Sequence, residues 1–309
     1  MSASPSYEQA LLALAAERDE LVVLTAENRA HIRGVPQALG PRFLDVGICE
    51  QTMVGAAAGL AVRGRTPVVH ALATFLTLRA FEFIRTDVGI PGLPVKLVGF
   101  VPGLLSEANG PTHQALDDVA VMRAIPGMQV FCPADLEELV TALPAILASP
   151  APAYVRYTAA PAAVTHVEPF AIGKAELLAR EDGVAILTYG TLLGEADKAR
   201  VRLAARGVPV RLVNLRSLEP VDEEAIVDAV RCSELVVTIE DHFHRGGLHT
   251  ILAETCLAHG LAPRVVGIDL GASFFKPALL PDVLAHEGLT AARIADRILD
   301  ALCKREAHA

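Results

Sequence analysis

Residues 42–51 read Arg-Phe-Leu-Asp-Val-Gly-Ile-Cys-Glu-Gln, and the order of residues in this stretch indicates the fold class. Phe43–Val46 is a short apolar run typical of a buried strand. Gly47 permits a tight turn, and Glu50–Arg63 is predicted to be a helix. Because a strand that leads directly into a helix is the repeating unit of a parallel sheet, the stretch predicts an α/β fold.

The same alternation continues on both sides of this stretch. Strands and helices that follow one another in this way predict a mainly parallel sheet with helices on both faces. The predicted strands are Glu20–Leu24, Pro67–Ala71, Val95–Phe100, Gln129–Phe131 and Ala153–Tyr157, and the predicted helices are Tyr7–Arg18, Phe75–Val88, Leu116–Ala124 and Leu136–Leu147.

A second alternating region follows a break in the pattern. Thr158–Pro169 is rich in Ala, Pro and Thr without periodicity, which predicts a linker. We therefore predict two α/β domains, residues 1–165 and 166–309. The second has predicted strands Val184–Thr188, Pro209–Asn214, Leu235–Ile239 and Val265–Ile268 and helices Leu193–Arg206, Glu223–Val230, Gly247–His259 and Thr290–Leu302.

The composition narrows the classes of protein to consider. The chain has 309 residues, 52% of them hydrophobic, and a formal net charge of −9, which argues against a nucleic-acid surface. No apolar run is long enough to cross a bilayer, and the N-terminus lacks a secretory signal pattern. Five cysteines without metal or disulfide spacing fit a reducing cytoplasm. We therefore expect a cytoplasmic protein that contacts neither membrane nor nucleic acid.

Glu50 and His113 are the first candidates for chemistry. Ligands of open parallel sheets bind at the carboxyl ends of strands, where Glu50 is expected. From position alone, a first-turn glutamate favoured by the helix dipole is the commoner explanation. His113 lies in residues 110–114, Gly-Pro-Thr-His-Gln, whose glycine and proline restrict the backbone. A plain surface histidine is the simpler alternative.

His242 and His244 suggest a metal site at first sight. Their i, i+2 spacing after a strand differs from the i, i+4 spacing of helical zinc sites. We therefore predict no metal site in this chain.

Taken together, several segments resemble the C-terminal portion of the transketolase family, over nearly the whole chain. The resemblance implies a thiamine-diphosphate pyrimidine-binding fold followed by a transketolase C-terminal domain. It is carried by residues 42–51, Thr74-Phe75-Leu76 with Arg79-Ala80, residues 110–114, the blocks Met-Arg-Ala-Ile-Pro at 122–126 and Cys-Pro-Ala-Asp at 132–135, and Glu-Asp-His at 240–242 with Gly-Gly-Leu at 246–248.

The resemblance gives Glu50 a defined task. It implies a carboxyl group that hydrogen-bonds the pyrimidine N1′ of thiamine diphosphate and favours the imino tautomer, whose nitrogen takes the thiazolium C2 proton. Phe75 is implied to stack on the pyrimidine, although some family members place the stacking aromatic at the position of Leu78. His113 is implied to hydrogen-bond substrate oxygens near C2.

Two further residues concern the substrate. Arg156 matches a family arginine that binds substrate phosphate, a task suited to an arginine fork. A strand-end surface cation is the alternative. Asn109 stands where the family often has an aspartate that reads a sugar hydroxyl, and a phosphate-side histidine is replaced near Val101. These departures leave open an unusual ketose, a differently charged sugar or an acyl-type donor.

The chain lacks the Gly-Asp-Gly motif and downstream Asn with which full-length relatives hold Mg²⁺ and the diphosphate. The resemblance therefore implies one subunit of a split transketolase, which transfers a two-carbon ketol unit between sugars. The partner would be an N-terminal-section subunit that carries the diphosphate-binding domain and Mg²⁺, in an α2β2 assembly.

Two other functions stay open. One is a decarboxylating relative, either a deoxyxylulose-phosphate-synthase-like ligase or the β component of a 2-oxo-acid dehydrogenase. The other is a non-catalytic structural subunit, which the retention of Glu50 disfavours.

Overall fold

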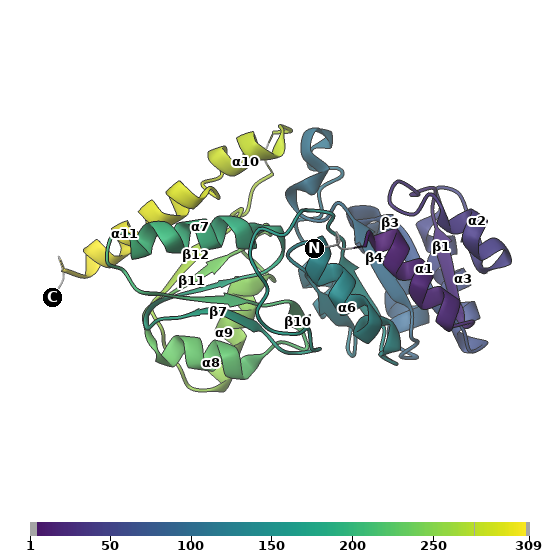
Figure 1. Ribbon diagram of the computed structural model, residues 1–309, viewed down its shortest axis with the longest axis horizontal. Coiled ribbons are helices and arrows are strands. Elements are labelled where there is room, and N and C mark those ends of the chain that lie inside the picture. The colour runs from purple at the N-terminus through teal and green to yellow at the C-terminus, as the bar shows by residue number, and fades with distance from the viewer. Residues whose placement is uncertain (1–4, 275, 307–309) are drawn as a thin grey trace.

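The computed structural model describes residues 5–274 and 276–306, which form two α/β units side by side (Figure 1). The first unit holds a seven-stranded sheet in the order β10-β5-β6-β4-β3-β1-β2. All neighbouring strands are parallel except β10, which pairs antiparallel with β5. The strands are β1 (Leu21–Thr25), β2 (Phe43–Asp45), β3 (Thr66–Leu72), β4 (Lys96–Phe100), β5 (Gln129–Phe131), β6 (Ala153–Arg156) and β10 (Ser217–Glu219).

Helices cover both faces of this sheet. On one face, α1 packs beside α6, and their apolar side chains share a core with β1 and β4. A capping box between Ser6 and Gln9 begins α1, and the Asp135 side chain caps α6. The helices of this unit are α1 (Tyr7–Glu17), α2 (Val35–Leu39), η1 (Gly40–Arg42), α3 (Glu50–Val62), η2 (Phe75–Arg79), α4 (Phe81–Phe83), η3 (Ile84–Gly89), η4 (Leu104–Asn109), α5 (Asp118–Arg123) and α6 (Leu136–Ala148).

The second unit holds a five-stranded sheet in the order β12-β11-β8-β9-β7. Only β7 is antiparallel to its neighbour. Figure 1 shows α7, α10 and α11 on one side of the sheet and α8 and α9 on the other. The elements are β7 (Glu176–Arg180), β8 (Gly183–Thr188), η5 (Gly190–Leu192), α7 (Leu193–Ala204), β9 (Val210–Asn214), α8 (Glu223–Arg231), β11 (Ser233–Ile239), α9 (Leu248–Ala258), β12 (Val265–Ile268), α10 (Leu280–His286) and α11 (Ala291–Glu306).

The two units are joined by more than a linker. Strand β10 comes after β9 in the chain but completes the sheet of the first unit. One hydrophobic core also runs from α3 and α5 of the first unit to α8 and α9 of the second. The predicted fold class, two mainly parallel sheets flanked by helices, is confirmed.

Some local predictions were wrong. The continuous helix predicted over Phe75–Val88 is instead two π-helical turns, η2 and η3, on either side of the short α4. The strands β7 and β10 and the helices α2 and α10 were not predicted. Residues 158–169 have no helix or strand, as expected of a linker, yet Thr158 is buried and His166 is partly buried in a polar network.

Candidate active site

Glu50 begins α3 at the carboxyl end of β2. Gly47, with φ +74°, makes the turn in a conformation that favours glycine. The Glu50 side chain is only 3% exposed, and its Oε2 accepts a hydrogen bond from Arg79 Nη1 at 2.8 Å. The chain thus places a buried, paired carboxylate at the carboxyl edge of its first sheet.

Phe75 and His113 lie next to this carboxylate. Phe75 and Arg79 both belong to the π-helical turn η2, and the Arg79 guanidinium lies 4.2 Å from the centre of the Phe75 ring. The edge-on His113 ring lies 5.1 Å from the Phe75 ring, with 66° between the planes. A π-helical turn is often found at functional sites. Glu50, Arg79, Phe75 and His113 therefore form one continuous group drawn from three segments.

A pocket of about 370 Å³ opens beside this group. It lies at the carboxyl ends of β1, β2 and β3, where open α/β sheets bind ligands. Its walls are partly apolar, with Glu50 as a buried acid, and Ile48 at its rim is 71% exposed. The lining residues are Ala26, Glu27, Asn28, Arg29, Ala30, Ile48, Glu50, Leu72 and Phe75. A flat heteroaromatic ring fits this lining, because Phe75 offers an apolar face and Glu50 a hydrogen-bonding group.

Leu78 and Asn109 lie outside the lining of this pocket. Leu78 is 45% exposed, whereas Phe75 lines the pocket. The Asn109 amide is exposed and donates to Ser106 Oγ at 3.3 Å. The structure thus groups Phe75, rather than Leu78, with Glu50.

The surroundings of Arg156 bear on both interpretations of its sequence position. Arg156 is not a surface cation, since its side chain is 4% exposed. Its Nε donates to Asp118 Oδ2 at 3.0 Å and its Nη1 to Asp241 Oδ1 at 2.7 Å. A third bond reaches the Ala115 carbonyl at 3.4 Å. Because two carboxylates already balance its charge, this geometry disfavours the predicted phosphate-binding role and favours a role in holding the two units together.

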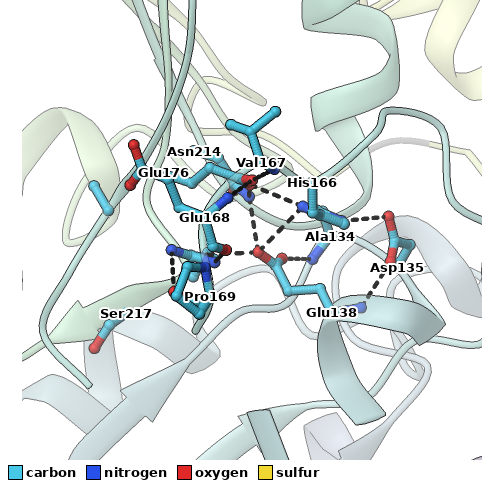
Figure 2. A network of polar contacts seen from close by, with 12 residues as sticks. Ala134, Asp135, Glu138, His166, Val167, Glu168, Pro169, Glu176, Asn214 and Ser217 are labelled. Carbon is cyan, nitrogen blue, oxygen red and sulfur yellow. Dashed lines mark hydrogen bonds and ion pairs between the residues drawn. The ribbon is translucent and has the colours of Figure 1, made fainter. Parts of the chain in front are cut away.

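A second buried polar network joins the units (Figure 2). The His166 ring nitrogens contact Asp135 Oδ2 at 2.9 Å and Glu176 Oε2 at 2.8 Å, and Asn214 Nδ2 donates to Glu138 Oε1 at 3.0 Å. The hydrogen bonds to Asp135 and Glu176 raise the pKa of His166 to about 10. The charged imidazolium therefore balances these carboxylates.

Within the described residues, Glu138, His166 and Glu176 form the one group of three side chains with metal-ligand spacing. None of the three lines the pocket beside Glu50. Of the two histidines considered from the sequence, His242 is fully buried and bonded to the Phe243 carbonyl, and His244 contacts Asp269 at 2.7 Å.

Sequence reasoning placed Arg79 and Asp241 in blocks that carry the family resemblance, but it named neither of them, nor Asp118, as a site residue. Arg79 comes four residues after Phe75, and residues four apart in a helical segment share a face. This spacing could have predicted that Arg79 lies beside Phe75. The Arg156–Asp241 pair had no such signal, because 85 residues separate its members.

The fold and the pocket define a two-unit α/β protein that presents a buried acid and an aromatic ring at a surface opening. Residues 1–160 match the transketolase pyrimidine-binding domain, and residues 173–294 match the transketolase C-terminal domain. The chain belongs to the transketolase family.

Similar proteins include separate subunits. The chain is 36% identical over 293 residues to the 6-deoxy-6-sulfo-D-fructose transketolase subunit SqwH of Clostridium sp. (strain MSTE9), covering 94% of this chain and 91% of that one. A solved structure, described as a split gene transketolase, inactive beta4 tetramer, superposes with a TM-score of 0.85 at 32% identity and 96% coverage of both chains.

A longer relative carries the name of another enzyme, a synthase rather than a transketolase. The 1-deoxy-D-xylulose-5-phosphate synthase of Thermomicrobium roseum is 36% identical over 300 residues, which are 95% of this chain but 47% of that protein. Among the residues that the structure describes, no helix is long and apolar enough to cross a membrane.

Proposed function

We propose that this chain is the subunit of a thiamine-diphosphate-dependent transketolase that supplies the cofactor-activating acid, Glu50. The buried carboxylate beside Phe75 at a surface-open pocket carries this proposal. When bound, thiamine diphosphate supplies the nucleophilic carbon that takes up a two-carbon unit. Glu50 would hold a proton at the pyrimidine N1′, and Phe75 would pack against the pyrimidine ring.

We assign the diphosphate and Mg²⁺ to a separate partner subunit. Mg²⁺ is usually held by one or two carboxylates together with phosphate oxygens. The sequence has no Gly-Asp-Gly motif, and similar proteins of matching length include a transketolase subunit and a split gene transketolase. The proposed assembly is α2β2 and cytoplasmic.

The substrates that we propose are sugars. His113 lies against Phe75, where its imidazole could hydrogen-bond oxygens near C2 of a ketose. Asn109 replaces the aspartate common in the family, and Arg156 is already paired with two carboxylates. Both observations favour a ketose other than the ordinary phosphorylated donors. The likeness to a 6-deoxy-6-sulfo-D-fructose transketolase subunit supports testing a sulfonated ketose.

A donor screen tests this proposal. The chain is purified with the diphosphate-binding subunit, supplied with thiamine diphosphate and Mg²⁺, and offered a neutral ketose, a ketose phosphate, a sulfonated ketose and pyruvate. We expect transfer of a two-carbon unit from a ketose to an aldehyde. Release of CO₂ from pyruvate would instead favour the decarboxylating alternative, which the 1-deoxy-D-xylulose-5-phosphate synthase relative keeps open. Cofactor binding without turnover of any donor would favour a structural subunit.

A further inference from the structure

Arg79 occupies the two groups that the proposed function reserves for the cofactor. Its Nη1 donates to Glu50 Oε2 at 2.8 Å. Its guanidinium lies over the Phe75 ring, 4.2 Å from the ring centre. A single side chain therefore uses both the buried acid and the aromatic face.

The guanidinium resembles the pyrimidine half of thiamine diphosphate in chemical form. Both are flat, delocalised groups in which nitrogen atoms are bonded to a common carbon. A guanidinium presents N–H donors in its plane and stacks on aromatic faces. A pyrimidine that holds a proton at N1′ likewise presents an in-plane N–H to a carboxylate.

We propose that Arg79 is a built-in substitute for the aminopyrimidine, which pairs with Glu50 in the free subunit and is displaced when the cofactor binds. This inference rests on the proposed function of Glu50. A buried carboxylate without a partner is costly, so a subunit without cofactor needs such a counter-ion. Arg79 supplies it from the chain itself.

The exposure of the two side chains makes the exchange feasible. The Glu50 side chain is 3% exposed and stays in place, whereas the Arg79 side chain is 39% exposed. The guanidinium can therefore move into water by rotation of its own side chain. Binding of the cofactor then replaces one hydrogen bond to Glu50 by another, and its affinity is reduced by the strength of the pair that must be broken.

The test compares cofactor binding in the complete two-subunit complex. Arg79→Gln removes the charge and the planar fork, so thiamine diphosphate should bind about threefold to tenfold more tightly than to the wild-type complex by calorimetry. Arg79→Lys keeps a charge that can pair with Glu50, so the complex with this variant should bind thiamine diphosphate with an affinity between those of the wild-type and Arg79→Gln complexes. Arg206→Gln, at an exposed arginine after α7, is the matched control and should leave the affinity unchanged.

The free subunit gives an independent readout. Arg79→Gln should lower its thermal midpoint, because Glu50 loses its counter-ion, and the double variant Arg79→Gln/Glu50→Gln should recover most of the loss. Unchanged or weaker cofactor binding by Arg79→Gln, or an unchanged midpoint of its free subunit, would overturn the inference. A wild-type complex that binds no thiamine diphosphate would instead refute the proposed function itself.

Discussion

Arg156 shows at the residue scale how a buried charge is accommodated in this protein. Its guanidinium lies between Asp118 and Asp241, which belong to different units of the fold. Adding a Cβ to Gly103 would bring that atom within 1.7 Å of Asp241 Oδ2, so the segment before His113 packs directly on this ion pair. Arg156 therefore positions the segment that leads to His113, as well as the junction of the two units.

Replacing Arg156 separates this role from phosphate binding. Arg156→Ala leaves two buried carboxylates without a counter-ion, so the free energy of unfolding should fall by about 3–5 kcal/mol. Urea unfolding measures this loss, with Arg206→Ala as a control at an exposed arginine. A variant of wild-type stability with a raised KM only for phosphorylated substrates would restore the phosphate-binding role.

The sequence allowed some of these residues to be predicted and not others. Glu50, Phe75 and His113 stand in short motifs, so their positions could be proposed from local sequence. The partners of Arg156 and Glu50 depend on how strands and helices meet in the folded chain. Glu50 and Arg79 are 29 residues apart in the sequence, and no local sequence pattern predicts their contact.

At the scale of elements, the central strands of the sheets could be predicted from the sequence, whereas the edge strand β10 and the π-helical turns could not. The parallel strand β4 is buried at every position and has no charged or polar side chain after Lys96, and this pattern is strong in the sequence. The strand β10 has three residues and pairs at an edge, so it leaves little pattern. The π-helical turns after β3 share their apolar content with an ordinary helix, which is why one continuous helix was predicted there.

The linker, residues 158–169, contains a histidine, His166, whose pKa is strongly raised in the folded protein. Hydrogen bonds to Asp135 and Glu176 raise the pKa of His166 from 6.5 to about 10, so the folded chain keeps a proton that the unfolded chain releases above pH 6.5. The stability that His166 contributes is complete below pH 6.5 and is lost as the pH rises through 10. The free energy of unfolding should therefore fall with rising pH more steeply in the wild type than in His166→Gln.

Urea unfolding above pH 7 tests this through the difference in pH slope between the two proteins. Burial lowers the pKa of Lys96 to about 7, and its opposing contribution is the same in both proteins. Burial raises the pKa of Glu138 to about 7, so its titration lies mostly below that range. His259→Gln is the control, since His259 pairs with Glu223 at an exposed site. Equal pH slopes for the wild type and His166→Gln would show that His166 is not charged in the folded protein.

At the scale of the whole molecule, the proposed function makes this chain one half of a site that a partner subunit completes. The pocket beside Glu50 opens to the surface. Two apolar side chains of the segment that leads to Glu50 are exposed, Leu44 at 41% and Ile48, which lines the pocket, at 71%. Apolar side chains exposed around a pocket are typical of a surface that another protein covers. The family assignment and the two-unit fold could be predicted from the sequence, because the motifs run through nearly the whole chain. The proposed sugar could not be identified from the sequence, because in the proposed assembly the partner contributes to the completed site.

If Glu50 controls the proton at the cofactor, removal of the C2 proton of thiamine diphosphate must depend on its carboxyl group. Exchange of the C2 proton of thiamine diphosphate is followed by NMR in the two-subunit complex with Mg²⁺. Glu50→Gln keeps the shape of the side chain but cannot share a proton, so exchange and turnover should both fall by about 10² to 10⁴ while the subunits still assemble. The chain without its partner should not accelerate exchange. Exchange in the Glu50→Gln complex within a few-fold of the wild type would show that Glu50 does not control this proton.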